Sequence, residues 1–281
     1  MEMNNSLLIN RFFTRNTFKE IIEDGFSSTY SEVVDKYVAD SYKKTNSECI
    51  REIYSYLKNN YRNEYYYKNT LLNKLLLGLH SVRTTTALTE VPIAKSKADF
   101  ILINGKAVVY EIKTPLDNFD RLMGQIEDYY KVFTRVVVVT GEDEYSSLSK
   151  KLLGLPVGIC VLTKRGTLSL RKEAIEFKDM LNKTEIFSVM RKNEYENVLS
   201  SISSLPNTTQ CRYYRVCREM FESIDLDISY NLFIRELKKR SKVNNTEFKC
   251  IPYELKFLAY FSEYKEREYG KLYSFLNNKG G

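Results

Sequence analysis

The chain has 281 residues, of which 43% are hydrophobic, enough for one large domain or two smaller ones. No apolar run approaches the length of a membrane span, and the N-terminus lacks the basic-then-apolar order of a signal peptide, so we expect a cytoplasmic protein. The net charge of +7 is compatible with a polyanionic partner but does not prove one. Five scattered cysteines and one histidine argue against a zinc site and a disulfide framework.

Helical periodicity dominates the first quarter of the chain. Between about residues 6 and 45, the spacing of apolar residues predicts two or three amphipathic helices. A further helix is predicted to begin after the Asn46–Ser47 pair, and a leucine-rich helix is predicted from Glu64 to about Leu79. We interpret His80, which follows, as a helix-end or surface residue because nothing near it in the sequence supplies a catalytic partner.

The next stretch predicts strands. β-Branched residues from Thr84 to Ile93 predict one strand, broken at Pro92. The residues from Asp99 to Lys113 predict two apolar strands joined by an Asn-Gly hairpin turn. Side chains alternate along a strand, so Glu111 and Lys113 share a face, and Asp99 on the neighbouring strand can lie beside Glu111. Two carboxylates and a lysine are therefore predicted to converge at a strand end.

A mixed sheet covered by helices is the fold class that the following elements predict. Asp117 or Asn118 is expected to cap a helix that runs to about Phe133. The unbroken apolar run 136–140 is typical of a strand buried on both faces. The α/β unit is completed by a helix at about 144–153 and by strands at 157–162 and 167–170.

Past about residue 171, helical spacing returns, and the basic cluster 238–240 is interpreted as a solvated helix end. Composition and periodicity together predict three regions. They are an N-terminal helical region at 1–60, an α/β core at 61–172 and a C-terminal helical region at 173–281.

Asp99 followed by Glu111-Ile112-Lys113 resembles the D-x(n)-E-x-K core of the PD-(D/E)XK nuclease superfamily. The resemblance covers about residues 64–172, where the predicted order of helix, three strands, helix and strand is that of the superfamily core. Ala98 stands where the family has a proline before the first acid. This departure leaves the role of the acid intact.

A second match lies on the helix that follows. Gln125 and Tyr129, one turn apart, match the Q-x-x-x-Y pair of the RecB-like branch of the superfamily. The whole run from Glu111 to Tyr129 also resembles a family of uncharacterised bacterial and prophage proteins with a predicted nuclease core. This longer spacing is much more specific than E-x-K alone.

The resemblance implies a restriction-endonuclease-like sheet and a Mg²⁺- or Mn²⁺-dependent nuclease that hydrolyses phosphodiester bonds, with DNA as the expected substrate. Asp99 and Glu111 are the implied metal ligands, together with the main chain of Ile112. Lys113 would activate water or stabilise the transition state. The residues implied to position this lysine and the nucleic acid are Gln125 and Tyr129.

A further acid usually joins such a metal shell, and Glu90 and Glu64 are the candidates in this sequence. We favour Glu90 slightly because the following turn, Lys95–Lys97, brings it back toward Asp99. A solvated glutamate is the alternative interpretation of each candidate.

Other readings stay open. The chain could be a non-catalytic nucleic-acid-binding or interaction module that keeps a nuclease fold. It could also be an RNA-directed nuclease or toxin, which would share the chemistry and differ in substrate. The sequence does not choose among phage defence, mobile-element biology and repair. A homodimer or a protein partner also stays open, and no membrane partner is expected.

Overall fold

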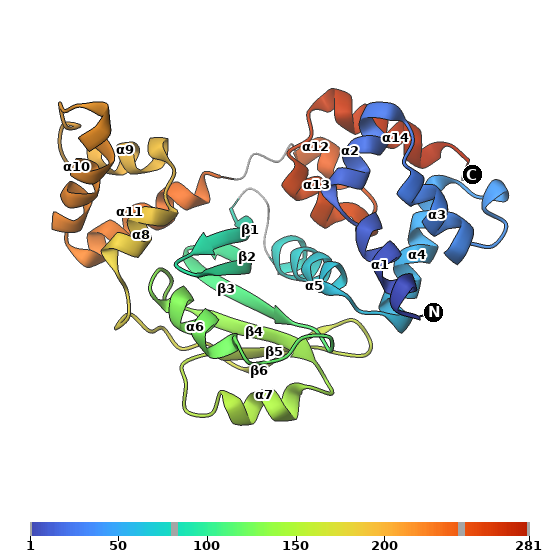
Figure 1. Cartoon of the computed structure of the whole chain (residues 1–281), viewed down its shortest axis with the longest axis horizontal. Helices are drawn as coiled ribbons and strands as arrows, with labels where there is room; N and C mark the ends of the chain where they lie inside the picture. Colours follow the sequence, from blue (N-terminus) through green and yellow to red (C-terminus); the bar gives the residue numbers. More distant parts are fainter. Residues whose placement is uncertain (1, 80–83, 241–244, 280–281) are drawn as a thin grey trace. The chain divides into compact units, whose positions relative to one another are not determined.

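The computed structural model describes residues 2–79, 84–240 and 245–279 (Figure 1). His80, interpreted above as a helix-end residue, lies outside these ranges. Contacts divide the chain into two compact units, Met1–Leu79 with Lys242–Gly281, and His80–Ser241. Over the described ranges, no helix is long and apolar enough to cross a membrane.

The first unit is helical, as its apolar spacing predicts. Its helices are α1 (Glu2–Phe12), α2 (Arg15–Asp24), α3 (Ser28–Tyr37), α4 (Asn46–Asn60), α5 (Glu64–Leu71), a π-helix (Leu72–Leu79), α12 (Asn245–Cys250), α13 (Lys256–Ser262) and α14 (Glu266–Asn277), with 3-10 turns at Ser41–Lys43 and Tyr253–Leu255. The cap of α4 is Thr45, one residue earlier than predicted, because Thr45 and Glu48 form a reciprocal capping box. The predicted leucine-rich helix changes from α to π geometry at Leu72.

The second unit contains a mixed sheet, which confirms the predicted fold class. Its strands are β1 (Thr86–Ile93), β2 (Ser96–Asn104), β3 (Lys106–Lys113), β4 (Val136–Gly141), β5 (Gly158–Leu162) and β6 (Leu168–Lys172). They lie in sequence order across the sheet. Strands β3, β4 and β5 are parallel, whereas the β1–β2, β2–β3 and β5–β6 pairs are antiparallel. The carboxyl ends of β3 and β4 therefore meet at one edge of the sheet.

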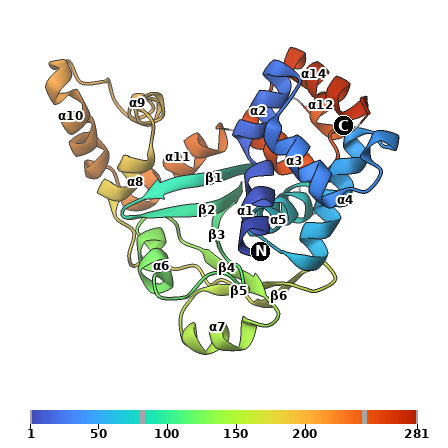
Figure 2. The same cartoon turned by 45° about the vertical axis from the view of Figure 1, so that its right-hand side comes forward.

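Helices cover one face of this sheet (Figures 1 and 2). They are α6 (Leu122–Tyr130), α7 (Tyr145–Lys151), α8 (Lys183–Val189) and α11 (Leu226–Lys238). Two further helices, α9 (Lys192–Ser200) and α10 (Gln210–Ser223), pack against α11 and α8, respectively. Apolar residues of α6, α8 and α11 share one buried cluster with Ile101, Val109 and Val138 of the sheet. This packing fixes α6 over the strands that carry the predicted acids.

In both β1 and β2, the side of the strand that is buried changes partway along. The change occurs at the same height in the two paired strands. Strict alternation would put Leu88 and Val91 on opposite faces of the sheet, yet both belong to the same buried cluster. Between them, Glu90 has a φ of 56°, which rotates the chain as a β-bulge does. On β2 the same change separates Ala98 from Ile101, so that Asp99 lies at the kink. A period-two pattern cannot predict this irregularity.

The sequence predicted that Pro92 breaks the first strand, and this prediction is wrong. Pro92 lies within β1 and pairs in register with Lys97. The reason is that β1 is at the edge of the sheet, where a residue without an amide hydrogen loses no ladder hydrogen bond on its outer side.

The two units differ from the three regions predicted from composition. Residues 242–281 join the N-terminal helices, because α14 contacts α2 and α4, and the Asn46 side chain donates to the Phe275 carbonyl at 2.8 Å. Residues 173–241 belong with the sheet, because Phe187 and Phe233 enter its core. Helix α5, expected in the α/β core, groups with the first unit.

Two smaller expectations are wrong. Helix α6 begins at Leu122, and Asp117 instead accepts hydrogen bonds from the amide and hydroxyl of Thr114, which closes a turn after β3. The cluster 238–240 is not wholly a solvated helix end. Arg240 is only 10% exposed and is paired with Glu194.

Candidate active site

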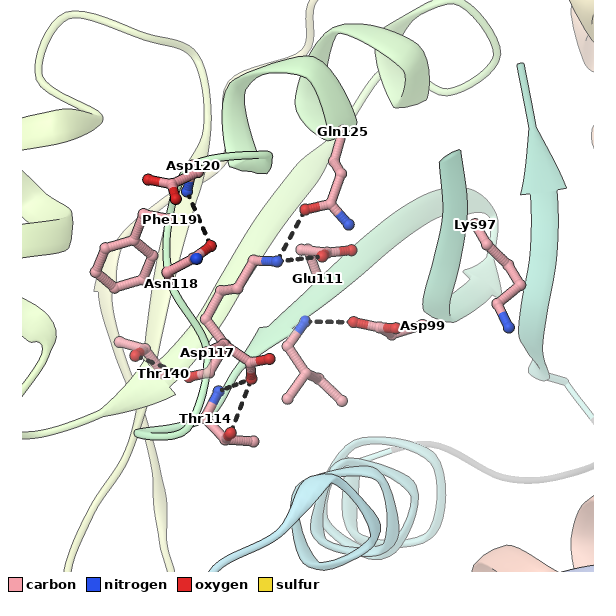
Figure 3. A network of polar contacts seen from close by, with 12 residues as sticks. Lys97, Asp99, Glu111, Thr114, Asp117, Asn118, Phe119, Asp120, Gln125 and Thr140 are labelled. Atoms are coloured by element: carbon pink, nitrogen blue, oxygen red, sulfur yellow. Dashed lines mark hydrogen bonds and ion pairs between the residues drawn. The ribbon is translucent and has the colours of Figure 1, made fainter. Parts of the chain in front are cut away.

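Glu111 and Lys113 lie at the carboxyl end of β3, two residues apart and on the same face, as predicted (Figure 3). Both are buried, with 1% and 7% of their surface exposed. The Lys113 ammonium lies 3.0 Å from Oε1 of Glu111 and donates to Oε1 of Gln125 at 2.8 Å. The lysine is thereby held between a carboxylate on the sheet and an amide on α6.

Asp99 lies on β2 beside this pair. Phe100 pairs with Tyr110 in the antiparallel register, so the preceding residue of β2 is level with Glu111 on β3. Oδ2 of Asp99 accepts a hydrogen bond of 2.8 Å from the amide of Ile112 (Figure 3). The two predicted carboxylates are therefore brought to one level of adjacent strands, and Ile112 contributes its main chain by orienting Asp99.

Tyr129 and Gln125 project from α6 toward the strand end, as their spacing of one helical turn predicts. The Tyr129 hydroxyl is 2.6 Å from Oε2 of Glu111 and 3.0 Å from the Lys97 carbonyl oxygen. Burial of the ring and then the nearby Glu111 carboxylate raise the pKa of Tyr129 far above its usual value. The hydroxyl therefore stays protonated and donates its hydrogen toward Glu111.

Glu90 and Glu64, the two candidates for the further acid, lie in different units. A carboxylate oxygen of Glu90 and one of Asp99 lie within 4.8 Å of each other. Glu90 also forms an ion pair with Lys97. Glu64 begins α5 of the first unit, where it pairs with Lys68 at 2.6 Å. Within the second unit, Glu90 therefore lies near Asp99.

Asp128 is a residue that the sequence reasoning missed. Its Oδ2 accepts hydrogen bonds from the Ser96 hydroxyl at 2.7 Å and the Lys95 amide at 3.3 Å, and its Oδ1 pairs with Lys131 at 2.7 Å. Burial alone would raise the pKa of Asp128, but the hydrogen bonds from Lys131 and Ser96 outweigh it and lower the pKa below its usual value. Its position immediately before Tyr129 was the one available signal.

The contacts of Asp128 and Tyr129 fasten the β1–β2 hairpin to α6. Asp128 binds the turn at Lys95 and Ser96, and Tyr129 binds the next carbonyl along the strand, that of Lys97. One helix therefore holds both the hairpin that carries Glu90 and Asp99 and the strand that carries Glu111.

The chemistry of the side chains gathered here fits a hard divalent cation. Glu90 and Asp99 have carboxylate oxygens within 4.8 Å of each other, and Glu111 lies level with Asp99 on the adjacent strand. Carboxylate oxygens are the ligands that Mg²⁺ and Mn²⁺ prefer, so these residues could hold such an ion. Each carboxylate oxygen has two lone pairs, so the contacts of Glu111 with Lys113 and Tyr129 do not use up its capacity as an acceptor. The Lys113 ammonium is placed where it could stabilise negative charge close to such an ion.

Comparison with known proteins identifies the family. The model of the family described as "Bacteriophage P4 protein cII" matches residues 57–251, which include the sheet, α6 and every residue of the site above. A curated relative, "Protein cII" of Enterobacteria phage P4, is 25% identical over 169 residues. That match covers 58% of this chain and 62% of the relative. Among solved structures, none matches this chain. Because the family model matches more than half of the residues of this chain, the chain belongs to the bacteriophage P4 protein cII family.

Proposed function

We propose that this protein is a metal-dependent nuclease that hydrolyses phosphodiester bonds, with DNA as its substrate. The observation that carries the proposal is the buried Glu111–Lys113 pair at the end of β3, with Asp99 level with it on β2. Burying two opposite charges seldom stabilises a fold more than apolar residues of the same volume would. A buried pair at a strand end, next to further carboxylates, therefore supports a role in chemistry.

Three side chains would hold the cation, namely Glu90, Asp99 and Glu111. A bound Mg²⁺ or Mn²⁺ would lower the pKa of a coordinated water and neutralise charge on the scissile phosphate. The Ile112 amide orients Asp99, and Tyr129 orients Glu111, so the protein presents these oxygens without rearranging its main chain. Positioned ligands of this kind lower the entropic cost of binding both the ion and the substrate.

Lys113 would act on the attacking water or on the phosphate. Its ammonium is fixed by Glu111 and Gln125, so its charge has a defined place at the strand end. An ammonium held there stabilises negative charge as it develops on a phosphate oxygen. Gln125 thus serves as a positioning residue that keeps the lysine directed toward the carboxylates.

The substrate class is tested by offering several nucleic acids to the purified full-length chain. Supercoiled plasmid, linear duplex DNA, single-stranded DNA and RNA are incubated with Mg²⁺, with Mn²⁺ and with EDTA. We expect metal-dependent cleavage of DNA. Binding without cleavage of any substrate would instead support a non-catalytic nucleic-acid-binding module, and cleavage of RNA alone would support an RNA-directed nuclease.

Replacing the lysine tests the site itself. We expect Lys113→Met to lower the rate of DNA cleavage by about 10² to 10⁴-fold, because the variant removes the positioned charge but keeps an unbranched side chain. The matched control is Lys106→Met, an exposed lysine at the other end of β3, which should cleave at the wild-type rate. Circular dichroism and thermal unfolding show whether each variant is folded. A folded Lys113→Met protein with wild-type activity would refute the assignment.

A further inference from the structure

Lys97 is a charged residue that the chemistry above does not use. It lies at the start of β2, where its ammonium pairs with the Glu90 carboxylate. An oxygen of that carboxylate lies within 4.8 Å of an oxygen of Asp99. A positive charge therefore lies beside Glu90, one of the three acids.

The main chain of Lys97 is held by the helix that also holds Glu111. The Tyr129 hydroxyl lies 3.0 Å from the Lys97 carbonyl oxygen, and the preceding residue, Ser96, donates to Asp128 at 2.7 Å. The Lys97 side chain is nevertheless 60% exposed. These main-chain contacts fix the start of the side chain, and its length limits where the ammonium can reach.

The balance of charge decides what this ammonium does. Three carboxylates and the two ammonium groups of Lys97 and Lys113 leave a net charge of about −1. One divalent ion and one phosphodiester would bring the site to neutrality, whereas a second divalent ion would leave two uncompensated positive charges. Glu90, one of the three carboxylates that would hold the ion, is itself paired with Lys97, so part of its charge is already compensated.

We propose that the site binds a single divalent ion, and that Lys97 supplies the positive charge that a second ion would otherwise bring. This inference rests on the proposed function, because it concerns the same acids. It assigns Lys97 a role as the residue that sets the number of metal ions. The inference depends on the charge and place of Lys97 and not on the exchange of a proton.

The test is a titration of the full-length chain with Mn²⁺, in which free Mn²⁺ is measured by electron paramagnetic resonance. The wild type should bind one ion at the site. We expect Lys97→Met to bind this first ion about tenfold more tightly and to take up a second ion, because a nearby repulsive charge is removed. Lys106→Met, which removes an exposed lysine at the far end of the hairpin, should behave as the wild type. Asp99→Asn should no longer bind the Mn²⁺ ion that the wild type binds, and this loss assigns the ion to this site.

Two results would overturn the inference. One is a wild-type protein that binds two ions or none at the site, and the other is a Lys97→Met protein with unchanged ion number and affinity. The proposed function fails separately. A wild type that binds one ion but cleaves no nucleic acid contradicts the nuclease and leaves the ion count standing, whereas cleavage with two bound ions contradicts only the ion count.

Discussion

Among the described residues of the second unit, two ion pairs have both side chains buried, Arg240 with Glu194 and Lys113 with Glu111. The two pairs differ in the number of hydrogen bonds that join the partners. Arg240 donates from Nε and Nη2 to the two carboxylate oxygens of Glu194, both at 2.6 Å. Lys113 makes one contact with Glu111, at 3.0 Å. The side chains of both pairs are 10% exposed or less. Burial alone therefore does not distinguish the two pairs.

The other hydrogen-bond partners of the two ion pairs distinguish them. Arg240 also donates to the Val189 carbonyl, and Glu194 accepts the Arg191 amide, so the pair joins the start of α9 to the chain after α11. Around Glu111 and Lys113 the remaining contacts are with side chains, Gln125 and Tyr129, and Asp99 lies on the adjacent strand. A bidentate pair closed by main-chain groups is an element of the fold. A pair with one contact, in a row of polar side chains at a strand end, keeps capacity for a ligand.

Breaking the closed pair should have the largest effect on stability. We expect Arg240→Met to lower the free energy of unfolding by about 3–5 kcal/mol, because it leaves Glu194 buried without its counter-charge. Cleavage per folded molecule should be unchanged. Urea denaturation measures the loss, and hydrogen exchange in α9 and α11 assigns it to this unit.

A matched double variant sharpens this prediction. Glu194→Leu together with Arg240→Met should recover most of the stability, because both buried charges are removed and apolar volume replaces them. The comparison would break down if Arg240→Met abolished cleavage while the protein stayed folded. The helical pair would then belong to the chemistry as well as to the fold.

Tyr129→Phe should have a smaller effect that is confined to the site. The phenyl ring keeps the packing of this fully buried residue, but the variant lacks the single hydroxyl hydrogen, for which Glu111 and the Lys97 carbonyl are the two acceptors within reach. We expect cleavage to fall about tenfold and the free energy of unfolding to fall by about 1–3 kcal/mol. Single-turnover kinetics at saturating Mn²⁺ measure the first effect. If Gln125→Ala lowers the cleavage rate by the same factor, the loss comes from positioning of the side chains and not from ion binding. If Tyr129→Phe cleaves at the wild-type rate, Tyr129 does not belong to the site.

Much of this site could be predicted from the sequence because it depends on local periodicity. Strand alternation placed Glu111 and Lys113 on one face, and the hairpin brought Asp99 level with them. Helical spacing directed Gln125 and Tyr129 to the same place. Each of these relations joins residues separated by one hairpin or one helical turn.

The parts that could not be predicted depend on irregular backbone or on distant contacts. The left-handed conformation of Glu90 interrupts the alternation that the strand prediction assumed. The pairing of Arg240 with Glu194 joins residues 46 positions apart, so charge pattern alone favoured a solvated cluster. The grouping of α14 with the N-terminal helices is likewise a long-range packing result.

The smallest expected effect is on the pH dependence of the unfolding free energy, which isolates the contribution of the charge of Glu194 in its pair with Arg240. Burial alone would raise the pKa of Glu194, but the hydrogen bonds from Arg240 and the Arg191 amide outweigh it and lower the pKa below its usual value. A carboxyl group with a lowered pKa in the folded state adds stability above its unfolded pKa, and this stability is lost as the pH falls through the folded value. In Arg240→Met the buried Glu194 lacks its counter-charge and its pKa is raised. The difference in unfolding free energy between the two proteins should therefore be largest near neutral pH, begin to shrink above the unfolded pKa of about 4.3, and shrink further as the pH falls through the lowered pKa of the wild type. Asp128, whose pKa is also lowered, is present in both proteins, so its contribution cancels. Urea denaturation of both proteins between pH 7 and pH 3.5 measures the difference. A difference that does not change over this range would mean that Arg240 stabilises the helices by its contact with Val189 and not by the charge of Glu194.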